Sequence, residues 1–181
     1  MTQRQINYSP TRKHCRYHYY LFTTARDEDI PAMVDIERQI YGRAPWNRLA
    51  FEEELGRANR LYLVVKDDDK VVAYAGCDYY WRRRDAHITN IAVMPTYQHC
   101  GIGTELMMTQ MEVASRYQLE TMSLEVRVEN AAAKRLYHRL GFRDGRVKYH
   151  YYDDDHGDAL DMVAKLEGGS NFDKADFNTG F

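Results

Sequence analysis

The stretch Gln98-His99-Cys100-Gly101-Ile102-Gly103-Thr104 joins an apolar, β-branched run to a run with helical spacing. Residues 86–94 before it alternate in polarity and are bounded by Pro95, which is typical of a strand. The apolar residues after it recur at the spacing of one helix face: Leu106, Met107, Met111 and Ala114. Glycines at a strand-to-helix junction let backbone N–H groups approach an anion, and the helix N-terminus adds partial positive charge. The stretch therefore predicts a phosphate or pyrophosphate site.

This glycine loop is not specific by itself, because two glycines at a helix start are often a plain turn. It lacks the Gly-Lys-Ser/Thr ending of the nucleoside-triphosphate loop and the three glycines of the dinucleotide fingerprint. Both interpretations, plain turn and anion site, stay open on these residues alone.

The composition limits the class of protein. A chain of 181 residues suggests one domain with a core that needs no disulfide. The 29% of charged and 44% of hydrophobic residues are typical of a soluble globular protein. No apolar run approaches the roughly 20 residues of a membrane span, and no signal peptide is expected. The three cysteines, Cys15, Cys77 and Cys100, lack metal-ligand spacing, which favours reduced thiols in a cytoplasm.

The charge is unevenly distributed. The net charge of -2 argues against a basic nucleic-acid binder, but residues 1–20 carry Arg4, Arg12, Lys13 and Arg16 without any acid. This segment is interpreted either as a solvated, partly disordered extension or as a contact for RNA or a ribosome. We therefore divide the chain into a basic N-terminal extension (1–19), a domain (20–166) and a flexible C-terminal tail (167–181).

The sequence of the domain predicts strands and helices that alternate along the chain. The predicted helices run from about 30 to 40, from 47 to 55, after the glycine loop, and from 130 to 140, where Gly141 is a natural stop. The predicted strands cover residues 20–24, 60–66, 71–80, 86–94, 121–127, 142–152 and 159–166. Hairpins flank the alternating middle, so a mixed α/β sheet is expected rather than a purely parallel one.

Two side chains of the helix after residue 129 are candidates for chemistry. Asn130 opens that helix, where its side chain either caps the helix or bonds an amide of a ligand. Tyr137 lies about two turns further and projects from the same face, so it is either a core aromatic or part of a site. The residues alone leave both alternatives open.

Together these motifs resemble a known family. Gln98-x-x-Gly101-x-Gly103 is followed by Asn130-Ala131-Ala132-Ala133-x-x-Leu136-Tyr137-x-x-x-Gly141-Phe142. The order resembles the GNAT superfamily of N-acetyltransferases over about residues 20–166, and more closely its ribosomal-protein alanine N-acetyltransferase (RimI-like) branch. Three stretches support the branch: Asn90-Ile91-Ala92-Val93, Leu124-Glu125-Val126-Arg127, and His150-Tyr151-Tyr152 with Gly157-Asp158-Ala159. The resemblance implies a GNAT-like α/β fold, whose mixed, mostly antiparallel central sheet is flanked by helices and has splayed parallel strands that hold acyl-CoA.

The resemblance also implies acetyl-CoA as the co-substrate, with no metal. The thioester end would lie between the strands that end near Val93 and Arg127. The backbone of Ile91, Ala92 and Val93 would bond the pantetheine and polarise the acetyl carbonyl. Asn130 would bond the pantetheine arm. The pyrophosphate would be cradled by Gln98, His99, Cys100, Gly101, Ile102, Gly103 and Thr104.

The implied reaction transfers the acetyl group directly to an amine. An α-amine has a pKa of about 7.7–8.0, so it must lose a proton before it attacks. Glu125 matches the family's general base, acting directly or through a water, and Tyr137 would donate to the departing thiolate. No covalent enzyme intermediate is needed, because proximity supplies much of the rate. The alternative for Glu125 is an ordinary exposed carboxylate on a strand.

The acceptor is implied by two further places. Pro45 and Trp46 resemble the substrate-side loop of the branch. Tyr151 and Tyr152 resemble tyrosines that wall a narrow peptide entrance, or else are two tyrosines on an edge strand. The prediction is therefore a protein N-terminal α-amine, with an alanine-starting ribosomal protein as substrate. The alternatives are a GNAT that acetylates a small amine or a protein lysine, and a non-catalytic acyl-CoA-binding module.

The chain also departs from the family. Relatives carry arginines in the pyrophosphate loop, whereas this loop has His99, Cys100 and Thr104, so the anion would rely on backbone amides and the helix end. Direct transfer needs no thiol, so Cys100 is interpreted as inert. The run 153–158 is rich in aspartate but lacks the spacing of a calcium loop, which favours a polar turn.

Overall fold

The computed structural model describes residues 6–152 and 155–166. Within them, one sheet has eight strands in the order β1-β2-β3-β4-β5-β6-β8-β7. The strands are β1 (Thr11–Cys15), β2 (His18–Thr24), β3 (Arg60–Asp67), β4 (Lys70–Tyr80), β5 (Asp85–Val93), β6 (Thr121–Arg127), β7 (Arg143–Lys148) and β8 (Ala159–Lys165). Every neighbouring pair is antiparallel except β5 and β6, which run parallel.

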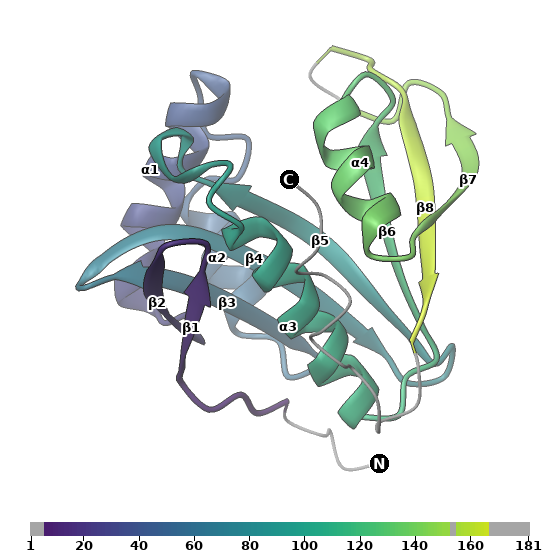
Figure 1. Cartoon of the computed structure of the whole chain (residues 1–181). Coiled ribbons are helices and arrows are strands. Elements are labelled where there is room, and N and C mark those ends of the chain that lie inside the picture. Colours follow the sequence, from purple (N-terminus) through teal and green to yellow (C-terminus); the bar gives the residue numbers. More distant parts are fainter. Residues whose placement is uncertain (1–5, 153–154, 167–181) are drawn as a thin grey trace.

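Helices cover both faces of the sheet. The α-helices are α1 (Ile30–Tyr41), α2 (Arg48–Leu55), α3 (Ile102–Arg116) and α4 (Ala131–Arg139), with short 3₁₀ turns at η1 (Asp27–Asp29) and η2 (Pro95–Tyr97). In Figure 1, α3 and α4 lie in front of the sheet, while α1 and α2 lie behind it. Two separate buried clusters follow from this arrangement, one under α3 and α4 and one under α1 and α2. The expected GNAT-like α/β architecture is confirmed.

The side-chain alternation of the central strands explains the two cores. In β3, Leu61 and Leu63 join the front cluster, while Tyr62 and Val64 join the back cluster, and all four are at most 2% exposed. A strand that is buried on both faces reads as a continuous apolar run, as residues 61–65 do. None of the helices in the described ranges is long and apolar enough to cross a membrane.

The N-terminal segment differs from the prediction. Residues 11–15 are not a solvated extension but the edge strand β1, which forms a hairpin with β2 in the register Cys15↔His18. The strand escaped detection because most of its side chains are exposed. Its buried part shows why it is ordered: Cys15 is 3% exposed, and Lys13 Nζ donates to Thr109 Oγ1 of α3 at 2.7 Å.

The C-terminal hairpin is also shorter than predicted. β7 ends at Lys148, and His150 adopts a positive φ of 52° that does not continue a strand. Tyr151 and Tyr152 therefore lie in the following loop, so the edge-strand interpretation of these tyrosines is wrong. Asp153 and Asp154 of the predicted polar turn, and the whole predicted flexible tail (167–181), lie outside the described residues.

The parallel pair β5–β6 opens into a wedge. Pairing runs only from Asp85↔Thr121 to Ile88↔Leu124, and beyond this point β5 follows β4 while β6 follows β8. A register shift beside Gly76 accompanies the opening. A Cβ at Gly76 would stand 2.3 Å from Tyr62 Cζ and 2.7 Å from Asn90 Oδ1, so the close approach of the backbone requires glycine. The predicted splayed strands are thus confirmed.

Candidate active site

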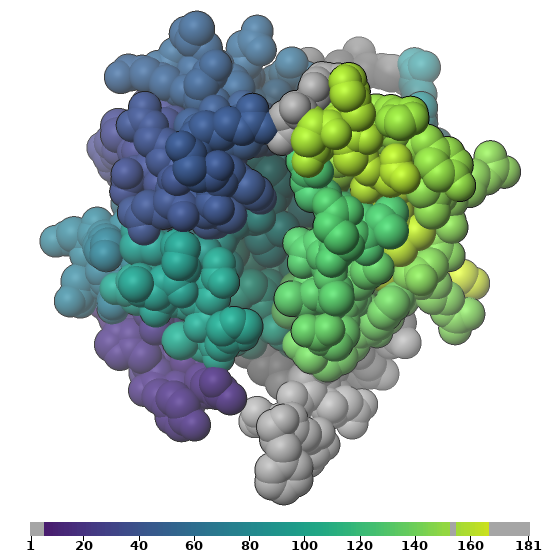
Figure 2. Space-filling view, turned by 90° about the horizontal axis from the view of Figure 1, so that it is seen from above, coloured from purple at the N-terminus to yellow at the C-terminus, as the bar shows by residue number. Residues whose placement is uncertain are grey.

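A cleft lies over the splayed strand ends. Seen from above, Figure 2 shows a groove between the blue and teal half of the molecule, which contains α1 and the start of α3, and the green half, which contains α4. The start of α3, which follows the glycine loop, lies on one side of this groove, and α4, the helix of Asn130 and Tyr137, lies on the other (Figure 2). The fold therefore brings the two motifs of the sequence to opposite sides of one cleft.

The glycine loop has the backbone geometry of an anion site. Gly101 occupies the N-cap position of α3 with φ of 86°, a conformation that favours glycine. Within the described residues no side chain caps α3, so its first-turn N–H groups are not taken by a cap. Ile102 anchors the turn in the core, while Gly103 and Thr104 are half-buried at the start of the helix. These residues fit a pyrophosphate held by backbone amides.

Three predicted loop residues have internal partners. The side-chain amide of Gln98 donates to the carbonyl oxygen of Val93 at 3.0 Å, which ties the loop to the end of β5. The thiol of Cys100 donates to the carbonyl oxygen of Gln98 at 3.5 Å. His99 is exposed and has a positive φ of 60°, and its carbonyl oxygen accepts a hydrogen bond from Arg16 Nη1 at 2.7 Å. The loop is thus braced from both the strand and the N-terminal hairpin.

The end of β5 presents its backbone to the wedge. Ile91, Ala92 and Val93 pair with β4 on one edge, and the parallel pairing with β6 has already ended at Ile88. Ala92 packs into the back cluster, while Ile91 and Val93 lie against the front cluster. Their predicted hydrogen bonds to the pantetheine and acetyl carbonyl stay a prediction that this open edge permits.

Glu125 lies on β6 between two basic groups. Its Oε1 accepts from Lys148 Nζ at 2.6 Å, and its Oε2 lies 3.0 Å from His87 Nε2. Burial alone would raise the pKa of the carboxyl, but the hydrogen bonds with His87 and Lys148 outweigh burial and lower the pKa to about 2. Glu125 is therefore a fixed carboxylate rather than the ordinary exposed side chain of the alternative interpretation; its side chain is 15% exposed.

His87 is the functional candidate that sequence reasoning missed. Burial lowers the pKa of its imidazole, but the hydrogen bond to Glu125 and the nearby carboxylates of Asp85 and Asp78 raise it overall. Its Nδ1 lies 2.9 Å from Ser123 Oγ. The feature of the sequence that could have identified His87 is its position on the strand before the glycine loop. This strand, β5, pairs in parallel with β6, and the register places His87 opposite Ser123.

These groups line a polar pocket of about 350 Å³ on the face of the sheet opposite α3 and α4. The residues that line it include Tyr80, Asp85, His87, Ser123, Glu125, Lys148 and Asp161. No three His, Cys, Asp or Glu side chains of residues 6–152 and 155–166 are arranged to hold a metal ion. The pocket is lined by three carboxylates and by the cations Arg83 and Lys148, and Lys148 is paired with both Glu125 and Asp161.

Tyr137 projects from α4 into the front core. Its side chain is 6% exposed and its ring centroid lies 5.7 Å from that of Phe142, so it belongs to the front core. Burial, with a smaller influence from the hydroxyls of Tyr41 and Tyr152, raises the pKa of Tyr137. The phenol therefore stays protonated at neutral pH, as a proton donor must.

Asn130 caps α4. Its Oδ1 accepts from the backbone N–H of Ala133 at 3.1 Å, so the N-cap interpretation is confirmed. The amide nitrogen of the same side chain is not used by that bond, and its predicted contact with the pantetheine arm stays a prediction.

The two predicted substrate loops have different environments. Trp46 packs on Phe51 with ring centroids 5.7 Å apart, and its backbone N–H donates to Glu37 Oε2 at 3.4 Å, while the neighbouring Pro45 is exposed. Glu37 is 3% exposed and also accepts from Tyr74 Oη, so a buried carboxylate holds this loop on the back core.

The tyrosine loop is held over basic side chains. The backbone N–H groups of Tyr151 and Tyr152 both donate to Gly157 O, at 3.0 and 3.1 Å. Their rings lie 5.2 Å apart, with Arg127 stacked 4.0 Å from the Tyr152 ring and Lys148 5.3 Å from the Tyr151 ring. Because Lys148 also binds Glu125, the tyrosine loop is joined directly to the polar pocket.

Comparisons with known proteins agree with this geometry. The Acetyltransferase (GNAT) family matches residues 30–142. An Escherichia coli (strain K12) protein named [ribosomal protein bS18]-alanine N-acetyltransferase is 32% identical over 140 residues, covering 76% of this chain and 92% of its own length. An N-alpha-acetyltransferase of Sulfurisphaera tokodaii is 32% identical over 159 residues, covering 81% and 93%.

A solved structure shows the same fold. The ribosomal-protein-S18-alanine N-acetyltransferase from Escherichia coli superposes with a TM-score of 0.74 at 27% identity, covering 90% of this chain and 99% of that one. Family match, relatives and fold agree on one class of enzyme, an acetyltransferase. This chain therefore belongs to the acetyltransferase (GNAT) family, whose members use acetyl-CoA.

Proposed function

We propose that this chain transfers the acetyl group of acetyl-CoA to the α-amine of a protein N-terminus, and that its substrate is a ribosomal protein that begins with alanine. The observation that carries the proposal is the pair Glu125–His87, which stands beside the open wedge on the pocket side of the sheet. The names of relatives that are 32% identical support the same class of acceptor.

The proposed donor site runs along the cleft from the glycine loop to the wedge. The first-turn amides of α3 would hold the pyrophosphate, and Asn130 would bond the pantetheine arm from the opposite wall. The free edge of β5 at Ile91, Ala92 and Val93 would bond the thioester end and polarise its carbonyl. The uncapped helix end and the unpaired strand edge are the observations that support this placement.

The proposed reaction needs two proton transfers, one from the amine on the pocket side of β6 and one to the thiolate on the α4 side. A proton that passes from an α-amine of pKa about 8 to a carboxyl of pKa about 2 would cost about 8 kcal/mol, so Glu125 is poorly matched as the final acceptor. We propose that Glu125 orients the amine or a water, and that His87 accepts the proton, since its pKa is raised toward that of the amine. Tyr137 would protonate the departing thiolate from the α4 side.

The proposed acceptor enters between the loop with Pro45 and Trp46 and the loop with Tyr151 and Tyr152. Both loops are held by specific contacts, to Glu37 in one case and to Gly157 in the other. A narrow entrance between these loops would admit a chain end and hinder a lysine side chain. We place this reaction in the cytoplasm, where ribosomal proteins are made, and assign no nucleic-acid contact to the hairpin.

The test is acetyl-CoA turnover with peptides that differ only in the first residue, against an N-blocked peptide with one lysine. Peptides that begin with alanine should be acetylated faster than peptides that begin with a large residue, and the blocked peptide should stay unmodified. Acetylation of the blocked peptide alone would contradict the N-terminal assignment and favour a lysine acceptor. Turnover only with small amines would favour a small-molecule acceptor.

A further inference from the structure

The glycine loop has no arginine or lysine of its own between Gln98 and Thr104, and the first charged residue of α3 is the acid Glu105. A pyrophosphate carries negative charge that backbone amides neutralise only in part. A cation from another part of the chain would therefore strengthen binding if the site holds acetyl-CoA.

The β1–β2 hairpin brings a cation to this place. Its two-residue turn is Arg16-Tyr17, closed by the pair Cys15↔His18. Figure 1 shows the hairpin tip beside the start of α3, although the two segments are more than 80 residues apart in the sequence. Arg16 Nη1 donates to the carbonyl oxygen of His99 at 2.7 Å, inside the glycine loop.

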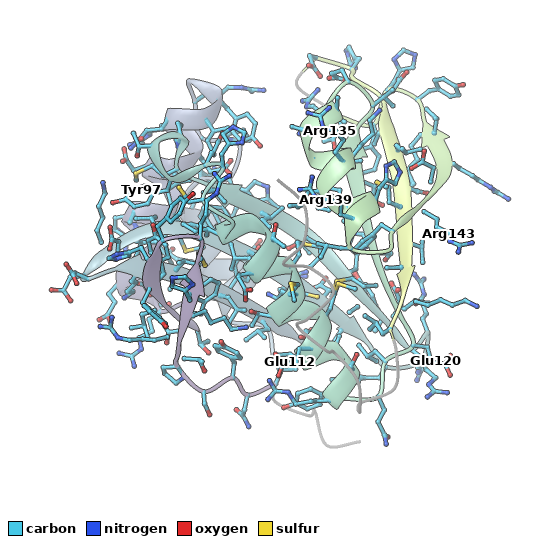
Figure 3. All side chains as sticks on the ribbon, viewed as in Figure 1. Tyr97, Glu112, Glu120, Arg135, Arg139 and Arg143 are labelled. Atoms are coloured by element: carbon cyan, nitrogen blue, oxygen red, sulfur yellow. The ribbon has the colours of Figure 1, made fainter. Side chains whose placement is uncertain are left out.

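The position of the tip is fixed by packing. Lys13 Nζ binds Thr109 Oγ1 at 2.7 Å and lies 3.5 Å from Glu105 Oε2, which docks β1 on α3. Tyr20 is 6% exposed and its ring lies 6.3 Å from that of Tyr97, which stands just before the glycine loop (Figure 3). The Lys13 charge is already compensated by Glu105, so Arg16 is the basic group that the hairpin offers to the loop.

The backbone conformation of the turn does not explain the arginine at position 16. Arg16 has a φ of 56°, where glycine or asparagine costs less than arginine. A guanidinium has five N–H donors in a planar fork, and the bond to His99 O uses one of them. The remaining donors match phosphate oxygens, which arginine binds in pairs.

We propose that Arg16 is a ligand for the phosphates of the bound acyl-CoA, and that the β1–β2 hairpin supplies the guanidinium that the glycine loop lacks. The inference rests on the proposed function, because it needs acetyl-CoA in the cleft. It assigns the basic N-terminal segment to cofactor binding rather than to RNA. The hairpin thereby becomes part of the donor site.

The test compares Arg16→Gly with Arg12→Ala. Glycine suits the positive φ, so Arg16→Gly removes the guanidinium without straining the turn. Arg12 is exposed on β1 of the same hairpin, and in the described part of the chain no contact joins it to the glycine loop, so Arg12→Ala removes equal charge from the hairpin. Calorimetry measures acetyl-CoA binding, and turnover is measured with acetyl-CoA and with S-acetylpantetheine, which has no phosphate.

We expect Arg16→Gly to weaken acetyl-CoA binding about tenfold and to leave turnover of S-acetylpantetheine within twofold of the wild type. Arg12→Ala should match the wild type with both donors. Equal weakening by the two substitutions, an equal loss with S-acetylpantetheine, or unchanged binding in Arg16→Gly would each overturn the role of Arg16. Failure of the wild type to bind acetyl-CoA would overturn the proposed function itself, and so is distinguishable from failure of this inference.

Discussion

At the scale of single residues, the pKa values of the side chains in the site depend on their charged neighbours. Glu125 and His87 are partners, and each shifts the other: the pKa of the carboxyl falls to about 2 and the pKa of the imidazole rises. Above the raised pKa of His87 the pair is a neutral imidazole 3.0 Å from a carboxylate, and only in this form does His87 accept the proton of the amine. The roles of the two residues are separable by substitution.

Glu125→Gln should lower kcat by about a hundredfold while the KM for acetyl-CoA stays within twofold, because the amide no longer attracts a proton or an ammonium. Steady-state kinetics with an alanine-starting peptide provides the measurement. Asp161→Asn is the matched control, since Asp161 also binds Lys148, at 2.9 Å, but lies on β8. An equal loss in both variants would show that only the Lys148 charge balance matters.

His87→Ala should abolish the rise of kcat with pH that is caused by deprotonation of the general base. In the wild type, kcat at saturating substrates should rise with pH through an apparent pKa above 6.5, because the neutral imidazole is the active form and its pKa is raised. In His87→Ala, kcat should be at least tenfold lower and nearly flat between pH 6 and pH 9. A variant that keeps the wild-type profile would exclude His87 as the base.

At the scale of elements, helix ends carry both stability and binding. Asn47 caps α2 and Asn130 caps α4 through the same contact, a side-chain oxygen that accepts from the N–H three residues on, at 3.0 and 3.1 Å. A cap of this kind contributes about 1 kcal/mol. The two helices differ in place, because α4 borders the groove in Figure 2, whereas α2 lies behind the sheet in Figure 1.

Asn130→Asp separates the cap from the ligand contact. Aspartate keeps the capping oxygen but loses the amide donor, so the free energy of unfolding should change by less than about 0.5 kcal/mol. The KM for acetyl-CoA should rise about tenfold if the amide bonds the pantetheine arm. Asn47→Asp is the control and should change neither quantity. A wild-type KM in Asn130→Asp would leave Asn130 as a cap and nothing more.

At the scale of the whole molecule, ion pairs tie the strands beyond the wedge. Lys148 of β7 binds Glu125 of β6 and Asp161 of β8, so one cation joins three strands. These hydrogen bonds raise the pKa of Lys148 while the pKa of Glu125 falls. A carboxyl whose pKa is depressed stabilises the fold above its ordinary pKa of 4.5 and loses this effect as the pH falls toward 2.

Lys148→Met should therefore lower the free energy of unfolding at pH 7 by about 1 kcal/mol, a modest value because the Lys148 side chain is 41% exposed and screened. The difference from the wild type should shrink as the pH falls toward 2, where folded Glu125 takes up a proton. Urea unfolding at pH 7 and at pH 2.5 provides the comparison. A difference that is equal at both pH values would mean that Lys148 acts through packing rather than charge.

Local sequence patterns predicted the family and most of the elements, but neither β1 nor the end of β7 at Lys148. Helix and strand periodicity depends on residues that are close in the sequence. For this reason the sequence predicted the apolar positions, the turn at Gly101, the cap at Asn130 and the ordered motifs. Which distant residues meet depends on the packing of the whole fold. His87 reaches Glu125 through the parallel register of β5 and β6, and Arg16 reaches His99 through a hairpin docked on α3. These contacts join residues 38 and 83 positions apart, and no local pattern encodes them, because they depend on how whole strands pack.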